Sequence, residues 1–92
     1  MAYASTNPFT GVVLKTFPDA TDAEVKQAIE KAHRAFLAWK GTSFDERGRI
    51  LQKAAVLLRR DKESYAKLLT LEMGKLLSEA KAEVELSARI FE

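Results

Sequence analysis

Residues 21–39, TDAEVKQAIEKAHRAFLAW, decide the fold class, because they contain both the start signal and the apolar pattern of an α-helix. Thr21 and Glu24 form a capping box, in which each side chain accepts a hydrogen bond from the backbone amide of the other residue. Apolar residues then recur at helical spacing: Val25, Ala28, Ile29, Ala32, Ala35, Phe36 and Trp39. The sequence therefore predicts a helix that starts after Thr21 and ends near Gly41.

Two further helices follow by the same reasoning. Ser43 and Glu46 make a second capping box, which opens a helix that we expect to end around Arg60. Asp61 is a residue type that caps helices, and we expect it to cap a third helix. That helix should stop at Gly74, because glycine readily adopts the left-handed conformation found after helix ends.

The fourth helix is predicted from residue 78 to the last residue. Ser78 is expected to cap it, and no stop signal precedes Glu92, so we expect the natural polypeptide to continue beyond this point. At about 100° per residue the helix carries two apolar stripes and should be covered on both sides. The stripes are Leu77, Ala80, Val84, Ala88 and Phe91 on one side, and Ala82, Leu86 and Ile90 on the other.

The first 18 residues have a different character. Residues 3–6 and 12–17 are β-branched and aromatic runs on either side of a turn that contains Pro8 and Gly11, which predicts a β-hairpin. A two-stranded ribbon is marginal alone, so it needs cover from elsewhere. The predicted fold is mainly α, with about four helices and a short N-terminal β-hairpin. Residues 1–18 form the hairpin or arm and residues 19–92 a helical layer, together one compact unit.

The composition limits the function classes. Ninety-two residues with 47% hydrophobic and 30% charged side chains indicate one soluble globular domain. The net charge of +2, from 15 basic and 13 acidic residues, is too balanced to favour a nucleic acid or a membrane as partner. The absence of cysteine excludes a disulfide framework, a thiolate zinc site and a cysteine nucleophile within these residues. We expect a cytoplasmic location, since there is no leader pattern and no apolar run of about 20 residues.

Two charged residues fall on apolar stripes. Arg47 lies among Ile50, Ala54 and Leu58 at helical spacing, and Glu72 lies near Leu68 and Leu69. A buried carboxylate without a partner is costly, so one interpretation is that Glu72 pairs with Arg47, and a second is that it binds a metal cation. In the third interpretation both charged groups reach solvent past their neighbours.

Other residue types that often carry chemistry have simpler explanations here. His33 is the only histidine and is expected at the surface, without a second histidine to share a metal. Glu79, Glu83 and Glu85 are expected on a solvated face beside lysines. No Gly-x-Gly-x-x-Gly or phosphate loop occurs, so we expect no catalytic and no cofactor-binding residue in this segment.

Four short motifs, in their order and spacing, resemble the amino-terminal segment of the aldehyde dehydrogenase superfamily, over about residues 6–89. The residues of the last motif, Leu71-Glu72-Met73-Gly74-Lys75, together with Ala82-Glu83-Val84, are most similar to those of succinate-semialdehyde dehydrogenases. Val12 and Leu76 depart from the residues that many members carry there, Glu and Pro. The motifs are Asn7-Pro8-Phe9-Thr10-Gly11, Ala35-Phe36-x-x-Trp39, Glu46-Arg47 and Leu71-Glu72-Met73-Gly74-Lys75.

The resemblance implies an N-terminal fragment of the NAD- or NADP-binding domain of a larger α/β enzyme. In that family a cysteine thiolate attacks an aldehyde, and the covalent thiohemiacetal is oxidised to a thioester and released as a carboxylic acid. The resemblance places the nucleophile, the base and the cofactor residues beyond residue 92, in the remainder of the same chain, and it implies a homo-oligomer. The fragment alone is expected to be inactive and to hold no cofactor.

One family site reaches this segment. Some members bind a monovalent cation through a main-chain carbonyl before the Asn-Pro turn and an acidic side chain before the Gly-Lys pair. These positions match Thr6 and Glu72, and the resemblance implies that the remaining ligands lie outside this segment.

A rival interpretation needs no enzyme. A self-standing helical interaction module would use the stripe of Ala82, Leu86 and Ile90 to bind a partner or a second copy of itself.

Overall fold

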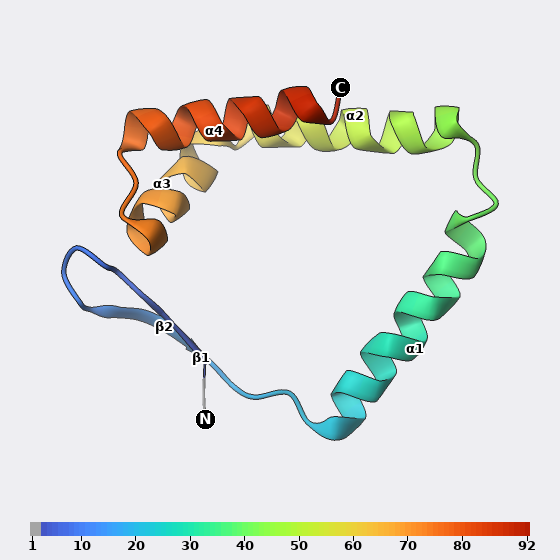
Figure 1. Ribbon diagram of the computed structural model, residues 1–92, viewed down its shortest axis with the longest axis horizontal. Coiled ribbons are helices and arrows are strands. Elements are labelled where there is room, and N and C mark those ends of the chain that lie inside the picture. The colour runs from blue at the N-terminus through green and yellow to red at the C-terminus, as the bar shows by residue number, and fades with distance from the viewer. Residues whose placement is uncertain (1–2) are drawn as a thin grey trace.

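The computed structural model describes residues 3–92 and contains a β-hairpin followed by four helices (Figure 1). This arrangement confirms the predicted mainly α architecture with an N-terminal hairpin. Among the described residues, none of the helices has the length and apolar character needed to cross a membrane. The elements are β1 (Tyr3–Thr6), β2 (Val13–Phe17), α1 (Asp22–Trp39), α2 (Phe44–Arg60), α3 (Lys62–Met73) and α4 (Leu77–Ile90).

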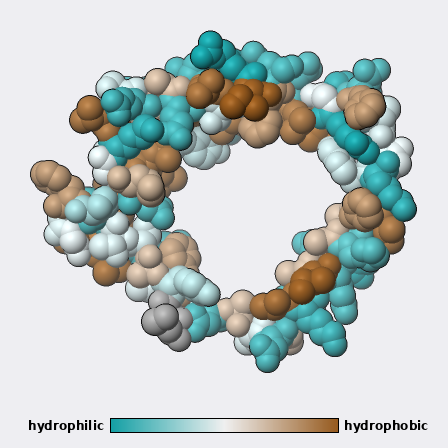
Figure 2. All heavy atoms as spheres, in the orientation of Figure 1, coloured by the Kyte–Doolittle hydropathy of each residue, from teal (hydrophilic) through white to brown (hydrophobic). Residues whose placement is uncertain are grey.

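Residues 3–92 form an open ring rather than a compact body. Figures 1 and 2 show α1 at the opposite side of a central opening from α3 and α4. The radius of gyration is 17.3 Å, against about 12 Å for a compact chain of this length. The expectation of one compact unit was therefore wrong. The chain is open because the apolar side chains of α1 are not covered by the described residues; Ile29 is 65% exposed and Phe36 is 54% exposed.

Local signals decide where the first two helices begin. The capping boxes of Thr21 with Glu24 and of Ser43 with Glu46 are both present, with four hydrogen bonds of 2.8–3.2 Å. These hydrogen bonds satisfy amides that the first turn of a helix cannot pair. The sequence prediction is confirmed here to the residue.

The starts of α3 and α4 differ from the prediction. Asp61 precedes α3, but its carboxylate does not cap the helix: it accepts hydrogen bonds from Arg60, which lower its pKa. Helix α4 starts at Leu77, two residues earlier than a cap at Ser78 allows, and Leu76 precedes it without a side-chain cap. At the other end of α3, Gly74 has φ +72° and closes the helix as predicted.

Small residues make the core. Ala66 of α3 and Ala80 of α4 are fully buried, and Val84 is 5% exposed beside them, with Leu58 and Leu69 packed around this cluster. Helix α4 packs against both α2 and α3. The inward stripe predicted for α4 is confirmed at Ala80, Val84 and Ala88, while Leu86 and Ile90 on the opposite side are 50% and 73% exposed.

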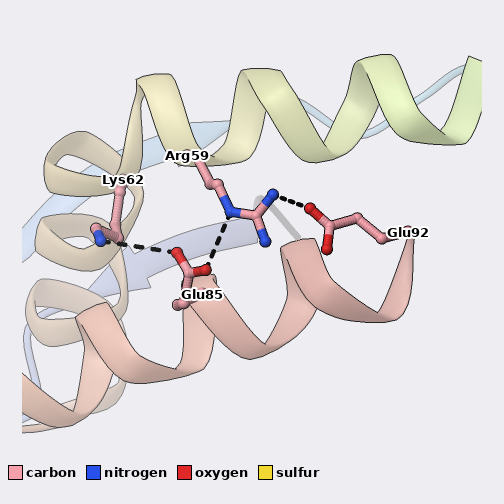
Figure 3. A network of polar contacts seen from close by, with 4 residues as sticks. All are labelled: Arg59, Lys62, Glu85 and Glu92. Carbon is pink, nitrogen blue, oxygen red and sulfur yellow. Dashed lines mark hydrogen bonds and ion pairs between the residues drawn. The ribbon is translucent and has the colours of Figure 1, made fainter.

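Ion pairs join α4 to α2 and α3 (Figure 3). The guanidinium of Arg59 in α2 donates to Glu85 at 3.0 Å and also to Glu92, and Lys62 lies 3.7 Å from Glu85. The hydrogen bond from Arg59 lowers the pKa of Glu92, and the same pairs raise the pKa of Arg59. Because these charged groups are partly exposed, solvent and salt weaken the ion pairs between them.

The tight contact between α3 and α4 predicts a large effect of adding volume there. Ala80→Leu adds three carbons to a site with no free space and should cost about 1–3 kcal/mol of unfolding free energy. Urea unfolding followed by circular dichroism measures it. Ala82→Leu on the exposed side of the same helix is the control, expected to change stability by less than about 0.5 kcal/mol. Equal losses in the two variants would contradict the packing.

Glu92 should stabilise the fold in a pH-dependent way. Its pKa is lower in the folded chain, so its contribution is present above the pKa of the unfolded state and is lost as the pH falls through the folded pKa. Glu92→Gln should lower the melting temperature at neutral pH and low salt, and the difference should disappear as the pH falls through the folded pKa of Glu92. Glu30→Gln in α1 is the matched control. A difference that persists in acid would exclude the ion pair as its cause.

Candidate functional site

The turn of the hairpin contacts the end of α3. A Cβ atom at Gly74 would lie 3.2 Å from Cγ of Pro8, which is closer than the neighbour could accept without moving. Since Gly74 also has a positive φ, any other residue there would strain the backbone and would require Pro8 to shift. The Asn-Pro turn and the Gly-Lys segment, distant in the sequence, therefore meet in the structure.

Hydrogen bonds within the turn fix the position of Pro8. The side-chain oxygen of Asn7 accepts from the amide of Phe9 at 2.9 Å, and the carbonyl of Asn7 accepts from the amide of Gly11 at 2.8 Å. Gly11 has φ +74°, a conformation that favours glycine. The turn is thus built from local chemistry that the sequence already contains.

A groove of about 360 Å³ runs between the hairpin and α3. Glu72 lies on its α3 side, and Lys15 of β2 is on the hairpin side, with its ammonium 5.2 Å from the centre of the Phe17 ring. The lining is mainly apolar, so a charge inside it is less well hydrated than on an open surface. The residues that line the groove are Ser5, Leu14, Lys15, Phe17, Leu68, Leu71 and Glu72.

Thr6 lies beside this groove at an irregularity of the hairpin. The strands pair with a register shift between Ser5 and Thr6, where one extra residue interrupts the ladder. The extra residue is Leu14, so the backbone groups that the bulge leaves out of the ladder belong to β2 and not to Thr6. The structure thus brings β1, which carries Thr6, against α3, which carries Glu72. Among residues 3–92, no three or more Asp, Glu, His or Cys side chains form a cluster suited to a metal ion.

Arg47 does not pair with Glu72, which excludes the first of the three interpretations and leaves the cation site and the solvent-exposed carboxylate. The Arg47 guanidinium donates to the hydroxyl of Thr42 at 2.9 Å and to the carbonyls of Trp39 and Lys40 at 3.1 and 3.2 Å. It also lies 5.7 Å from the centre of the Trp39 ring. Arg47 is at the start of α2, the end that is far from α3 (Figure 1), and acceptors from the end of α1 are nearer. Glu72 is exposed in α3.

Two further ion pairs involve helix α4. Glu83 pairs with Lys75, and Glu63 pairs with Lys81. His33 is exposed on α1, with its ring 6.4 Å from that of Phe36.

At the starts of α1 and α2 one first-turn amide of each helix, that of Glu24 and that of Glu46, is bonded to the chain's own Thr21 and Ser43 side chains. Sequence reasoning missed Ser5 and Lys15 at the groove, and no local signal could have found them, because their position depends on how the hairpin docks on α3.

Comparisons with known proteins find a matching family and several similar enzymes. The family model described as "Aldehyde dehydrogenase family" matches residues 1–92. The chain is similar to a succinate-semialdehyde dehydrogenase [NADP(+)] of Deinococcus radiodurans, with 46% identity over 96% of this chain and 18% of the relative. A second relative, succinate-semialdehyde dehydrogenase [NADP(+)] 1 of Mycobacterium tuberculosis, is 46% identical over 99% of this chain and 20% of the relative.

Solved structures of aldehyde dehydrogenases are also similar to this chain. The chain superposes with a TM-score of 0.89 on succinic semialdehyde dehydrogenase from Streptococcus pyogenes in complex with NADP+, at 40% identity over 98% of this chain and 20% of that one. For a NAD-dependent benzaldehyde dehydrogenase from Corynebacterium glutamicum the TM-score is 0.88, at 31% identity over 99% of this chain and 20% of that one. The chain thus spans about a fifth of the length of the relatives it matches. With the family model matched over residues 1–92, the chain belongs to the aldehyde dehydrogenase family.

Proposed function

We propose that this chain is the N-terminal part of the cofactor-binding domain of an NAD- or NADP-dependent aldehyde dehydrogenase that oxidises succinate semialdehyde to the carboxylic acid. The observation that carries the proposal is the 46% identity to succinate-semialdehyde dehydrogenases over nearly the whole chain. NADP is the favoured cofactor, because these relatives are named for it. When bound, the cofactor accepts the hydride of the oxidation.

The contribution of these residues is structural. Residues 1–18 provide the arm, residues 19–92 provide a helical layer, and the Pro8–Gly74 contact joins the two. The thiolate that the proposed chemistry needs must come from elsewhere in the polypeptide, since this chain has no cysteine. By itself the chain is inactive in this proposal, and the complete enzyme is a cytoplasmic homo-oligomer.

We further propose that Thr6 and Glu72 supply two oxygen ligands to a monovalent cation in the complete enzyme. Two observations support this: the exposed carboxylate of Glu72 at the groove, and the contact between β1, which carries Thr6, and α3. Lys15 lines the same groove, and its ammonium lies against the Phe17 ring. Two ligands are too few for tight binding, so the remaining oxygens would come from other segments.

The first test of the function is the mass of the native protein. An antibody against this segment should detect, in the source cell, a species several times heavier than 10.3 kDa. The purified species should reduce NADP+ when given succinate semialdehyde, while the 92-residue chain alone should not.

A native species of 10.3 kDa without dehydrogenase activity would overturn the proposal. The interaction module would then be favoured, since Leu86 and Ile90 present an uncovered apolar stripe. Sedimentation would show self-association insensitive to salt in that case. A heavy species that oxidises a different aldehyde would support the family assignment but exclude succinate semialdehyde as the substrate.

The cation proposal predicts a weak response in the isolated chain. Its melting temperature should be the same in potassium, sodium and choline chloride at equal ionic strength, because two ligands alone do not retain a cation. In the complete enzyme, potassium or sodium should raise the melting temperature relative to choline, and Glu72→Gln should abolish that rise. Glu30→Gln, on α1, should leave it intact. Tight saturable binding by the 92-residue chain, or a cation effect that survives Glu72→Gln, would contradict the assignment.

A further inference from the structure

Helix α1 ends without the usual glycine stop. The residue that follows its last turn, Lys40, has φ −61° and ψ −23°, which is still helical, and Gly41 does not adopt a positive φ. No basic residue lies in the last turn to interact with the terminal carbonyls. The carbonyls of Trp39 and Lys40 therefore need donors from beyond the helix.

Arg47 supplies these donors from the first turn of α2. One terminal nitrogen of its guanidinium donates to both carbonyls, at 3.1 Å to Trp39 and 3.2 Å to Lys40, and Nε donates to Thr42 at 2.9 Å. The planar guanidinium also lies over the rings of Trp39 and Phe44, at 5.7 and 5.8 Å from their centres. These contacts join the end of α1 to the start of α2 through one side chain.

Thr42, in the connection between α1 and α2, makes further hydrogen bonds at this joint. Its hydroxyl donates to the Trp39 carbonyl at 2.7 Å while accepting from Arg47, and its amide donates to the same carbonyl at 3.0 Å. A lysine at position 47 has the charge but not the planar fork, so it would not reproduce these contacts together.

Helix α1 makes no packing contact with another helix or strand among the described elements. Its direction is therefore set where it joins its neighbours along the chain, and at the joint with α2 the side chains of Arg47 and Thr42 make the contacts described above. We propose that Arg47 locks an elbow between α1 and α2, so that α1 points in a fixed direction before any further part of the protein covers it. The inference is independent of the proposed catalytic function.

Distance measurements between spin labels test the elbow in the 92-residue chain. The sequence has no cysteine, so labels attach only to introduced ones. Lys26→Cys in α1 with Lys53→Cys in α2 reports the elbow, and Lys53→Cys with Ala82→Cys in α4 reports the packed helices. The parent chain should give one narrow distance peak for each pair. Arg47→Ala should replace the elbow peak with a broad distribution and leave the α2–α4 peak narrow, and Arg47→Lys should broaden the elbow peak as well.

Three variants separate a lock from a general loss of structure. Arg49→Ala removes a neighbouring arginine that is exposed, and should leave both peaks unchanged. Thr42→Val should broaden only the elbow peak, and Thr42→Ser, which keeps the hydroxyl, should restore it. If the parent chain already gives a broad elbow distribution, or if Arg47→Ala and Thr42→Val leave a narrow peak, the proposal is wrong.

Discussion

The contact between Ala66 of α3 and Ala80 of α4 is the constraint on which the rest of the structure depends. Both side chains are fully buried, and their small size lets the two helix backbones approach closely. Helix α4 also packs on α2, so this contact fixes three of the four helices relative to one another. The end of α3 then holds the hairpin, because Pro8 lies against Gly74. A disturbance between α3 and α4 would therefore reach the groove at Glu72.

The core that results is small for the surface that the chain exposes. The accessible surface is 7632 Å², whereas a compact protein of the same mass exposes about 5,400 Å². Much of the excess is apolar, with Ile29 on α1 and Ile90 on α4 both more than half exposed. Large exposed apolar surfaces mark places where other protein binds. An aldehyde dehydrogenase of which this chain is about a fifth would provide such cover from its own sequence.

The sequence predicted what local chemistry decides and failed where the outcome depends on distant segments. Thr21 and Ser43 begin helices because their capping partners lie three residues away, so both starts were predictable. Asp61 failed as a cap because Arg60 competes for its carboxylate. Arg47, which helical spacing places on an apolar stripe, is partly buried, but the spacing could not identify its partners, because periodicity gives a direction from one helix and not the neighbouring atoms. The position of Glu72 beside the hairpin is likewise a tertiary result.

The hairpin and α1 are attached to the packed helices by different physics. The hairpin packs against α3 at Gly74, where a side chain would press on Pro8. Helix α1 is instead joined to α2 by hydrogen bonds from the charged side chain of Arg47. Arg47 sits in the first turn of α2, where the helix dipole disfavours a positive charge by about 0.3–1 kcal/mol, and the carboxyl end of α1 offsets this. Each hydrogen bond of the joint adds about 0.5–1.5 kcal/mol at most, because water competes for exposed groups. Such a joint can set the direction of α1 but leaves its apolar side chains in water, so further protein that covers α1 would add the free energy of burying them.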